Sequence, residues 1–206
     1  MSHILFTGFM PFDGRRYNAS WIAASGLCAN HGTHHIAHSL CIPVCWGEPN
    51  KHLIPAIERW QPRIIISMGE GKPEQFTLES RARNTRAQRQ DNNGSLPQDE
   101  LIEANGDTIR YSSAPLMSIA TALRESGINA RCSDDAGAYL CEELLYGLEG
   151  LKAHASHVEL VIFVHVPPFG TALEYRGKRT QCDAALLQNF TKTLLSTVLA
   201  HCSQPL

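Results

Sequence analysis

The 206-residue sequence lacks any apolar run that approaches the roughly 20 residues needed to cross a membrane. Its first residues, MSHILFTGF, also lack the basic segment and the long apolar segment of a signal peptide. We therefore expect neither a membrane-spanning helix nor a secretion signal, and we expect a cytoplasmic protein.

A strong charge of either sign is absent too, because 18 Lys and Arg side chains oppose 20 Asp and Glu side chains. The net charge of −2 gives no electrostatic reason to expect a nucleic acid or an anionic membrane as a partner. Internal repeats, low-complexity tracts and dividing linkers are also missing. Because a chain of this length can bury one sizeable core, we expect a single domain over residues 1–206.

The sequence contains no C-x-x-C pair, and its seven cysteines are an odd number. Both facts argue against a disulfide framework and a cysteine-rich zinc site, and they favour reduced thiols. The segment HGTHHIAH does hold four histidines, His31, His34, His35 and His38. No carboxylate or cysteine set accompanies them, so a solvated loop is favoured and no metal or cofactor is expected.

Apolar runs and helical spacings alternate along the chain. The apolar runs predict strands over 3–9, 35–46, 63–69, 128–133 and 159–168. The spacings of three and four predict helices over 18–29, 50–60, 113–127 and 180–202, and a further helix within 133–151. Residues 70–112 show no clear periodicity, which is usual for functional or flexible segments. The alternation predicts an α/β fold, a three-layer α/β/α sandwich around a mostly parallel twisted sheet.

Cys141 lies on the predicted helix within 133–151. Apolar residues share its face at helical spacing, which is typical of a free cysteine that simply packs. In such folds, however, ligands bind beyond the carboxyl ends of the strands, and this helix follows a strand that ends at Ser133. We expect Cys141 one to two turns into the helix, where the helix dipole supplies only part of the activation of a reactive thiolate.

A reactive cysteine needs a histidine and a group that orients it. His165 lies near the carboxyl end of the predicted strand 159–168 and is the candidate histidine. The alternative is that His165 only packs in the core. Glu70, Glu74 and Glu79 follow the strand 63–69, and their spacing does not choose among them. The residues alone therefore indicate a possible cysteine hydrolase, with glutamate, cysteine and histidine each at or beyond the end of a different parallel strand.

Four motifs, in this order along the chain, resemble those of the pyroglutamyl peptidase I (pyrrolidone-carboxylate peptidase) family. They are TGFMPFDGRRYNASW (7–21), TLESRARN (77–84), SDDAGAYLCEELLYGL (133–148) and FVHVP (163–167). The resemblance runs from about residue 3 to the final helix. It implies Cys141 as nucleophile, His165 as general base and acid, and Glu79 as the orienting carboxylate. It also implies release of an N-terminal pyroglutamyl residue from peptides through a thioester.

The resemblance further implies which residues surround the substrate, a small peptide with a blocked N-terminus. Phe9 and Phe12 correspond to an aromatic wall around the lactam ring. Tyr139 and Leu140 precede the nucleophile and are expected at the same pocket. Two groups are candidates to donate hydrogen bonds to the oxyanion. They are the backbone N–H of Cys141 and the side chain of Arg89. Members of the family are often tetrameric, so a homo-oligomer, tetramer or dimer, is a further expectation.

The match departs from the family pattern around Glu70 and after the nucleophile. GEGKPEQF (69–76) stands where the family has a glycine-rich loop, and Glu70 stands in place of a glutamine. Such a carboxylate would repel an acidic ligand or recruit a cationic one. Glu142 follows the nucleophile where the family prefers asparagine. The chain thus resembles a divergent member. Its alternatives are another N-terminal or cyclic amide substrate, or an inactive binding protein.

A glutamine amidotransferase is disfavoured, because these enzymes use a G-x-C-x-G turn and no glycine lies two residues before or after Cys141.

Overall fold

The computed structural model describes residues 2–27 and 35–202, which form one central sheet covered by helices. The strands, in spatial order, are β2 (His35–Ile42), β1 (Ser2–Phe9), β3 (Ile64–Glu70), β8 (Leu160–Val166), β4 (Phe76–Glu79) and β7 (Ala130–Ser133). The first four run parallel, whereas β4 runs antiparallel to β8, and β7 runs parallel to β4. The predicted mostly parallel sheet is confirmed, and its last two strands are reversed.

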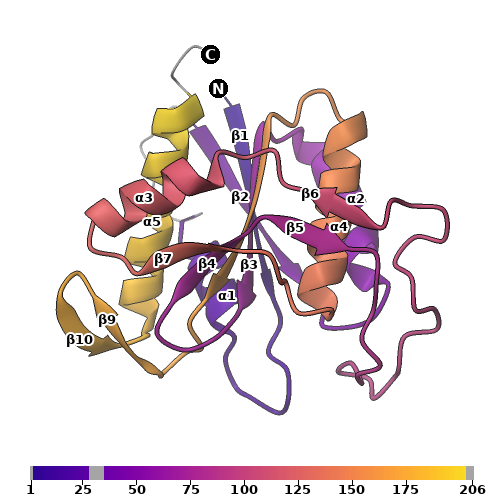
Figure 1. Cartoon of the computed structure of the whole chain (residues 1–206), viewed down its shortest axis with the longest axis horizontal. Coiled ribbons are helices and arrows are strands. Elements are labelled where there is room, and N and C mark those ends of the chain that lie inside the picture. The colour runs from indigo at the N-terminus through magenta and orange to yellow at the C-terminus, as the bar shows by residue number, and fades with distance from the viewer. Residues whose placement is uncertain (1, 28–34, 203–206) are drawn as a thin grey trace.

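Helices cover both faces of this sheet, as Figure 1 shows for α3 and α5 on one side and α2 and α4 on the other. The helices are α1 (Ala19–Ser25), α2 (Glu48–Trp60), α3 (Leu116–Glu125), α4 (Leu140–His154) and α5 (Ala184–Cys202). One hydrophobic cluster joins the sheet to α1, α3 and α5, and a second joins it to α2 and α4. The three-layer α/β/α sandwich is therefore confirmed.

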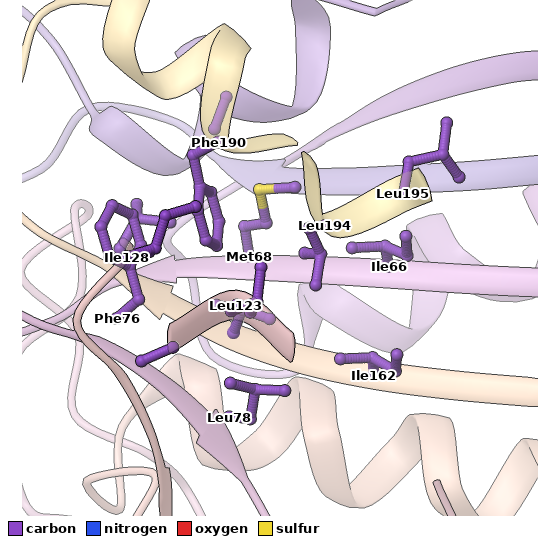
Figure 2. Packing of buried hydrophobic residues seen from close by; sticks show 14 of the residues in the cluster. Ile66, Met68, Phe76, Leu78, Leu123, Ile128, Ile162, Phe190, Leu194 and Leu195 are labelled. Atoms are coloured by element: carbon purple, nitrogen blue, oxygen red, sulfur yellow. The ribbon is translucent and has the colours of Figure 1, made fainter. Parts of the chain in front are cut away.

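The central strands are apolar along their whole length because both of their faces are buried. Figure 2 shows one face, where Ile66 and Met68 of β3 lie against Phe190 and Leu194 of α5. The alternate residues of the same strands join the second cluster, for example Phe163 of β8. The two clusters hold the sheet between its helical layers and fix the strand ends at which the candidate site lies.

Three strands lie within residues 70–112, where the sequence predicted no regular structure. They are β4 in the central sheet and the antiparallel pair β5 (Arg81–Arg83) and β6 (Ile109–Tyr111). A second unpredicted hairpin joins β9 (Ala172–Tyr175) to β10 (Lys178–Gln181), so α5 begins at Ala184 rather than at residue 180. Each of these strands has three or four residues, too few to build a clear period.

The helix that carries Cys141 begins later than predicted. Residues 134–139 form a loop in which Gly137 (φ 94°) and Ala138 (φ 54°) adopt positive φ. Left-handed backbone cannot continue an α-helix, so α4 starts only at Leu140. The expectation that Cys141 lies one to two turns into the helix is therefore wrong, because Cys141 is the second residue of the first turn.

Other features of the sequence have plain structural outcomes. Within residues 2–27 and 35–202, no helix is long and apolar enough to span a membrane. Over the same residues, no three His, Cys, Asp or Glu side chains are grouped to hold a metal ion. Of the four histidines in HGTHHIAH, His31 and His34 lie outside the described residues, and His38 in β2 stacks between His3 and Trp60. The six cysteines of the described residues are free, and Cys28 lies outside them.

Candidate active site

A cavity of about 280 Å³ opens at the carboxyl ends of β1, β3 and β8, above the first turn of α4. All residues that the sequence predicted for the site line it, namely Phe9, Phe12, Glu70, Glu79, Arg89, Tyr139, Leu140, Cys141 and His165. Strands that are far apart in the sequence, such as β1 and β8, thus contribute side chains to a single cavity.

His165 and Glu79 form a hydrogen-bonded pair inside this cavity, with Nδ1 of the imidazole 2.8 Å from Oε1 of the carboxylate. His165 lies opposite Thr77 across the antiparallel pair of β8 and β4. Because side chains alternate along a strand, Thr77 and Glu79 share one face of β4. The Thr77 hydroxyl donates a hydrogen bond to the same Oε1 at 2.7 Å, which fixes the carboxylate against the ring.

This arrangement corrects one expectation from the sequence. Glu79 was expected at or beyond the end of a parallel strand, but β4 runs antiparallel to β8. Glu79 therefore reaches the imidazole diagonally across the strand pair and not from a shared sheet edge. Its side chain is 1% exposed.

The thiol of Cys141 meets the imidazole of His165 above Gly69. Gly69 lies beside His165 in the register of β3 and β8. A Cβ at residue 69 would lie 2.7 Å from Sγ of Cys141 and 3.1 Å from Nε2 of His165. Both atoms therefore occupy space that only a glycine leaves free, and Nε2 is the imidazole nitrogen that does not contact Glu79.

The charges of this site are coupled. Burial by itself lowers the pKa of His165, but interactions with Cys141 and then with Glu79 raise it to about 10. Burial raises the pKa of Glu79, yet the hydrogen bond and charge of His165 outweigh it, so the net direction is down. Both directions favour a charged imidazolium beside a charged carboxylate at neutral pH.

The first turn of α4 presents free backbone donors next to the thiol. The N–H groups of Leu140 and Cys141 have no hydrogen-bond acceptor among the residues that the structure describes. Such unpaired donors are usual in the first turn of a helix and attract negative charge. The cavity therefore combines a thiol, an imidazole and oriented N–H groups.

Two buried carboxylates follow Cys141, and each is paired with an arginine. Glu142 accepts hydrogen bonds from the backbone N–H groups of Arg83 (2.6 Å) and Ala138 (2.8 Å), and its Oε2 lies 3.1 Å from Nη2 of Arg83. Glu143 contacts Nε of Arg86 at 2.7 Å. The side chains of both glutamates are 1% exposed. Their charges are balanced locally, and Glu142 fixes the loop that leads into the helix.

Glu70 does not offer the free charge that its replacement of glutamine suggested. Its side chain is 2% exposed and lies 2.5 Å from Nη1 of Arg15. It also accepts hydrogen bonds from the backbone N–H groups of Ala19 (2.9 Å) and Phe169 (3.3 Å). Because this carboxylate is fully paired, it has no free charge with which to repel or recruit a ligand.

Arg89 and Tyr139 form one wall of the cavity. The guanidinium lies 4.4 Å from the Tyr139 ring centroid and 3.0 Å from the carboxylate of Asp13. Trp46 packs edge-on against the same ring, with centroids 5.1 Å apart. Asn18, the first residue of the predicted helix 18–29, is the N-cap of α1 and also lines the cavity.

Several lining residues were not predicted from the sequence, namely Val44, Gly71, Lys72, Gln75, Thr77, Arg131 and Ser133. Thr77, Arg131 and Ser133 belong to β4 and β7. The alternation in FTLE, with Phe76 and Leu78 in the core and Thr77 and Glu79 at the site, is the signal that identifies β4.

Comparison with known proteins accounts for this combination of fold and site. A family model described as Pyroglutamyl peptidase matches residues 2–178. The chain belongs to the pyroglutamyl peptidase family. It is therefore a cysteine peptidase, and the resemblance seen in the sequence motifs is confirmed.

Individual members of the pyroglutamyl peptidase family match most of the chain. The pyrrolidone-carboxylate peptidase of Klebsiella pneumoniae is 36% identical over 171 residues, which cover 81% of this chain and 78% of that protein. The Brevibacillus brevis enzyme is 33% identical over 206 residues, 98% of this chain and 94% of that one. The crystal structure of Bacillus amyloliquefaciens pyroglutamyl peptidase I superposes with a TM-score of 0.85 at 28% identity, over 98% of both chains.

Proposed function

We propose that this protein removes an N-terminal pyroglutamyl residue from small peptides, with Cys141 as nucleophile, His165 as general acid and base, and Glu79 as the residue that orients the imidazole. The observation that carries the proposal is the convergence of the Cys141 sulfur and the His165 Nε2 above Gly69, with Glu79 bound to Nδ1 at 2.8 Å. Family membership supports the same reaction.

The raised pKa of His165 supports an imidazolium that holds the Nε2 proton beside Cys141 before substrate binds. The nucleophile is the thiolate form of Cys141. In the first step the thiolate attacks the pyroglutamyl carbonyl carbon, and the imidazolium gives its Nε2 proton to the departing peptide amine. The C–N bond breaks and a thioester remains on Cys141. In the second step the neutral imidazole takes a proton from water, and the resulting hydroxide releases pyroglutamate and restores the thiolate.

Negative charge on the carbonyl oxygen needs donors that are already oriented. The N–H of Cys141 in the first turn of α4 is one candidate, and Arg89 on the cavity wall is the other. Phe9 and Phe12 supply an apolar surface on which the flat, uncharged lactam ring can pack. Tyr139 and Leu140 complete the pocket between the ring and the nucleophile.

The proposal is tested by hydrolysis of a fluorogenic pyroglutamyl amide. The wild type should release the fluorophore, iodoacetamide should abolish release, and Cys141→Ala should be folded but inactive. The matched control is Cys132→Ala, which removes a half-buried thiol of β7 outside the cavity and should retain activity. Turnover by Cys141→Ala would contradict the mechanism. A folded wild type without turnover would contradict the substrate and favour another amide or a binding role.

A further inference from the structure

The cavity has an aromatic end and a positively charged end. The order of the strands places the aromatic end toward β1 and the charged end toward β7. Phe9 at the end of β1 belongs to the aromatic end, together with Phe12. Arg131 of β7 lies at the other end, and Lys72 lines the cavity from the loop that leads from β3 to β4. The strands that carry His165 and Glu79 lie between β1 and β7 in the sheet.

Strand register places Arg131 relative to the catalytic pair. Thr77 of β4 is aligned with His165 of β8 on one side and with Arg131 of β7 on the other. Residues aligned in this way point to the same face of a sheet. Neighbouring strands are about 4.8 Å apart, so the backbone of Arg131 lies about 10 Å from that of His165. An extended peptide covers this distance in about three residues.

The positive charges at this end have no partners in the described structure. Neither the Lys72 nor the Arg131 side chain forms a hydrogen bond or ion pair with any residue in 2–27 or 35–202. The surrounding carboxylates, in contrast, are all paired: Glu70 with Arg15, Glu74 with Arg179, Glu79 with His165, Asp134 with Arg81 and Asp135 with Arg83. Two exposed cations therefore face the cavity without compensation.

We propose that Lys72 and Arg131 form a subsite for an acidic side chain on the leaving-group side of the peptide. With the lactam ring at the Phe9 end and the cleaved bond at Cys141, the remaining chain extends toward β7. Asp or Glu at the first or second position after pyroglutamate then meets both cations. This inference rests on the proposed function and adds a preference among its substrates.

The test compares kcat/KM for the tetrapeptide amides pyroglutamyl-X-Ala-Ala and pyroglutamyl-Ala-X-Ala, with X as Glu, Gln or Lys. In at least one series we expect the order Glu, Gln, Lys, with Glu about three- to tenfold above Lys at low salt, as solvent-exposed ion pairs are individually weak. Added salt at about 0.5 M should reduce this ratio toward one, because it screens exposed charges.

Two variants connect the preference to these side chains. The double substitution Lys72→Gln and Arg131→Gln should bring the Glu-to-Lys ratio close to one. Lys192→Gln removes one exposed positive charge from α5, on the opposite face of the sheet, and should leave the ratio unchanged. The salt series on the wild type remains informative if the double variant does not fold.

Equal kcat/KM for the Glu and Lys peptides in both series, or a salt-independent ratio, would overturn the subsite while the proposed function stands. No hydrolysis of any pyroglutamyl peptide would contradict the proposed function, and the subsite with it.

Discussion

Gly69 is the residue on which the spacing of the candidate pair depends. Its missing side chain leaves the space in which Sγ of Cys141 and Nε2 of His165 meet. Gly69→Ala would place a methyl carbon 2.7 Å from the sulfur, so one of the two groups must move. We expect kcat to fall by about a hundredfold, since displacements near 1 Å have effects of this size. Steady-state kinetics measures the loss, and unchanged kcat in a folded variant would contradict this role.

The protonation of His165 gives a second prediction at the residue scale. The interaction with Cys141 is the largest contribution that raises the imidazole pKa to about 10. In Cys141→Ala this contribution is lost while that of Glu79 remains, so the pKa of His165 should fall. The imidazolium then deprotonates at a lower pH than in the wild type. NMR titration of the imidazole, assigned with His165→Asn, measures the change, and an unchanged pKa would rule out the coupled pair.

At the element scale, the start of α4 depends on Glu142. This carboxylate holds the backbone N–H groups of Ala138 and Arg83 with two different oxygens. Glutamine has one acceptor oxygen, so Glu142→Gln must release one of these groups and loosen the turn before Cys141. We expect kcat and the rate of Cys141 alkylation by iodoacetamide to fall together, by about tenfold or more.

The matched control for this prediction is Glu48→Gln, which changes a partly exposed carboxylate in the first turn of α2. It should alter neither rate. If Glu142→Gln alkylates Cys141 as fast as the wild type does, then Glu142 does not position the nucleophile.

The central strands and α2 could be predicted from the sequence because burial on both faces, or a clear apolar stripe, leaves a strong local pattern. The predicted run 63–69 differs from β3 by one residue at each end. The start of α4 could not be predicted. The apolar spacing continues through Gly137 into a loop with positive φ values, and this loop is also held by a long-range contact, in which the Ala87 N–H donates to the Ala138 carbonyl.

Within the candidate site, the sequence pattern also could not identify Glu79 as the carboxylate that contacts His165. Glu70, Glu74 and Glu79 are equivalent by spacing, and only the resemblance singled out Glu79. Its proximity to His165 follows from the reversed direction of β4, a four-residue strand that the sequence pattern did not reveal. Strand direction depends on packing across the whole sheet, so it is not encoded in the local order of residues.

At the scale of the whole molecule, Glu149 links stability to pH. Glu149 lies in α4 and is 8% exposed. Its Oε1 atom has no hydrogen-bond partner in the described structure. Burial raises its pKa to about 7, although Lys152 and Ser112 act in the opposite direction. An acid with a raised pKa in the folded state resists ionisation, so folding stability decreases as pH rises from about 4.5 to about 7.

Glu149→Gln removes this ionisation. We expect the variant to gain stability relative to the wild type between pH 5 and pH 8, by up to about 3 kcal/mol at the upper end. Urea unfolding at several pH values measures the difference. Glu58→Gln, an exposed carboxylate on α2, is the control and should show no such trend. A pH-independent difference would contradict the raised pKa.

Because β4 is short, catalytic activity depends on whether this strand pairs with β8 in the correct register. Its antiparallel register with β8 is defined by two aligned residue pairs, Thr77 with His165 and Leu78 with Val164. A shift by one residue would turn Glu79 toward the α3 and α5 layer and leave the imidazole without its carboxylate. During refolding, misaligned molecules would retain nearly all their helices and strands yet hydrolyse nothing. The recovery of activity should therefore lag behind the recovery of circular dichroism.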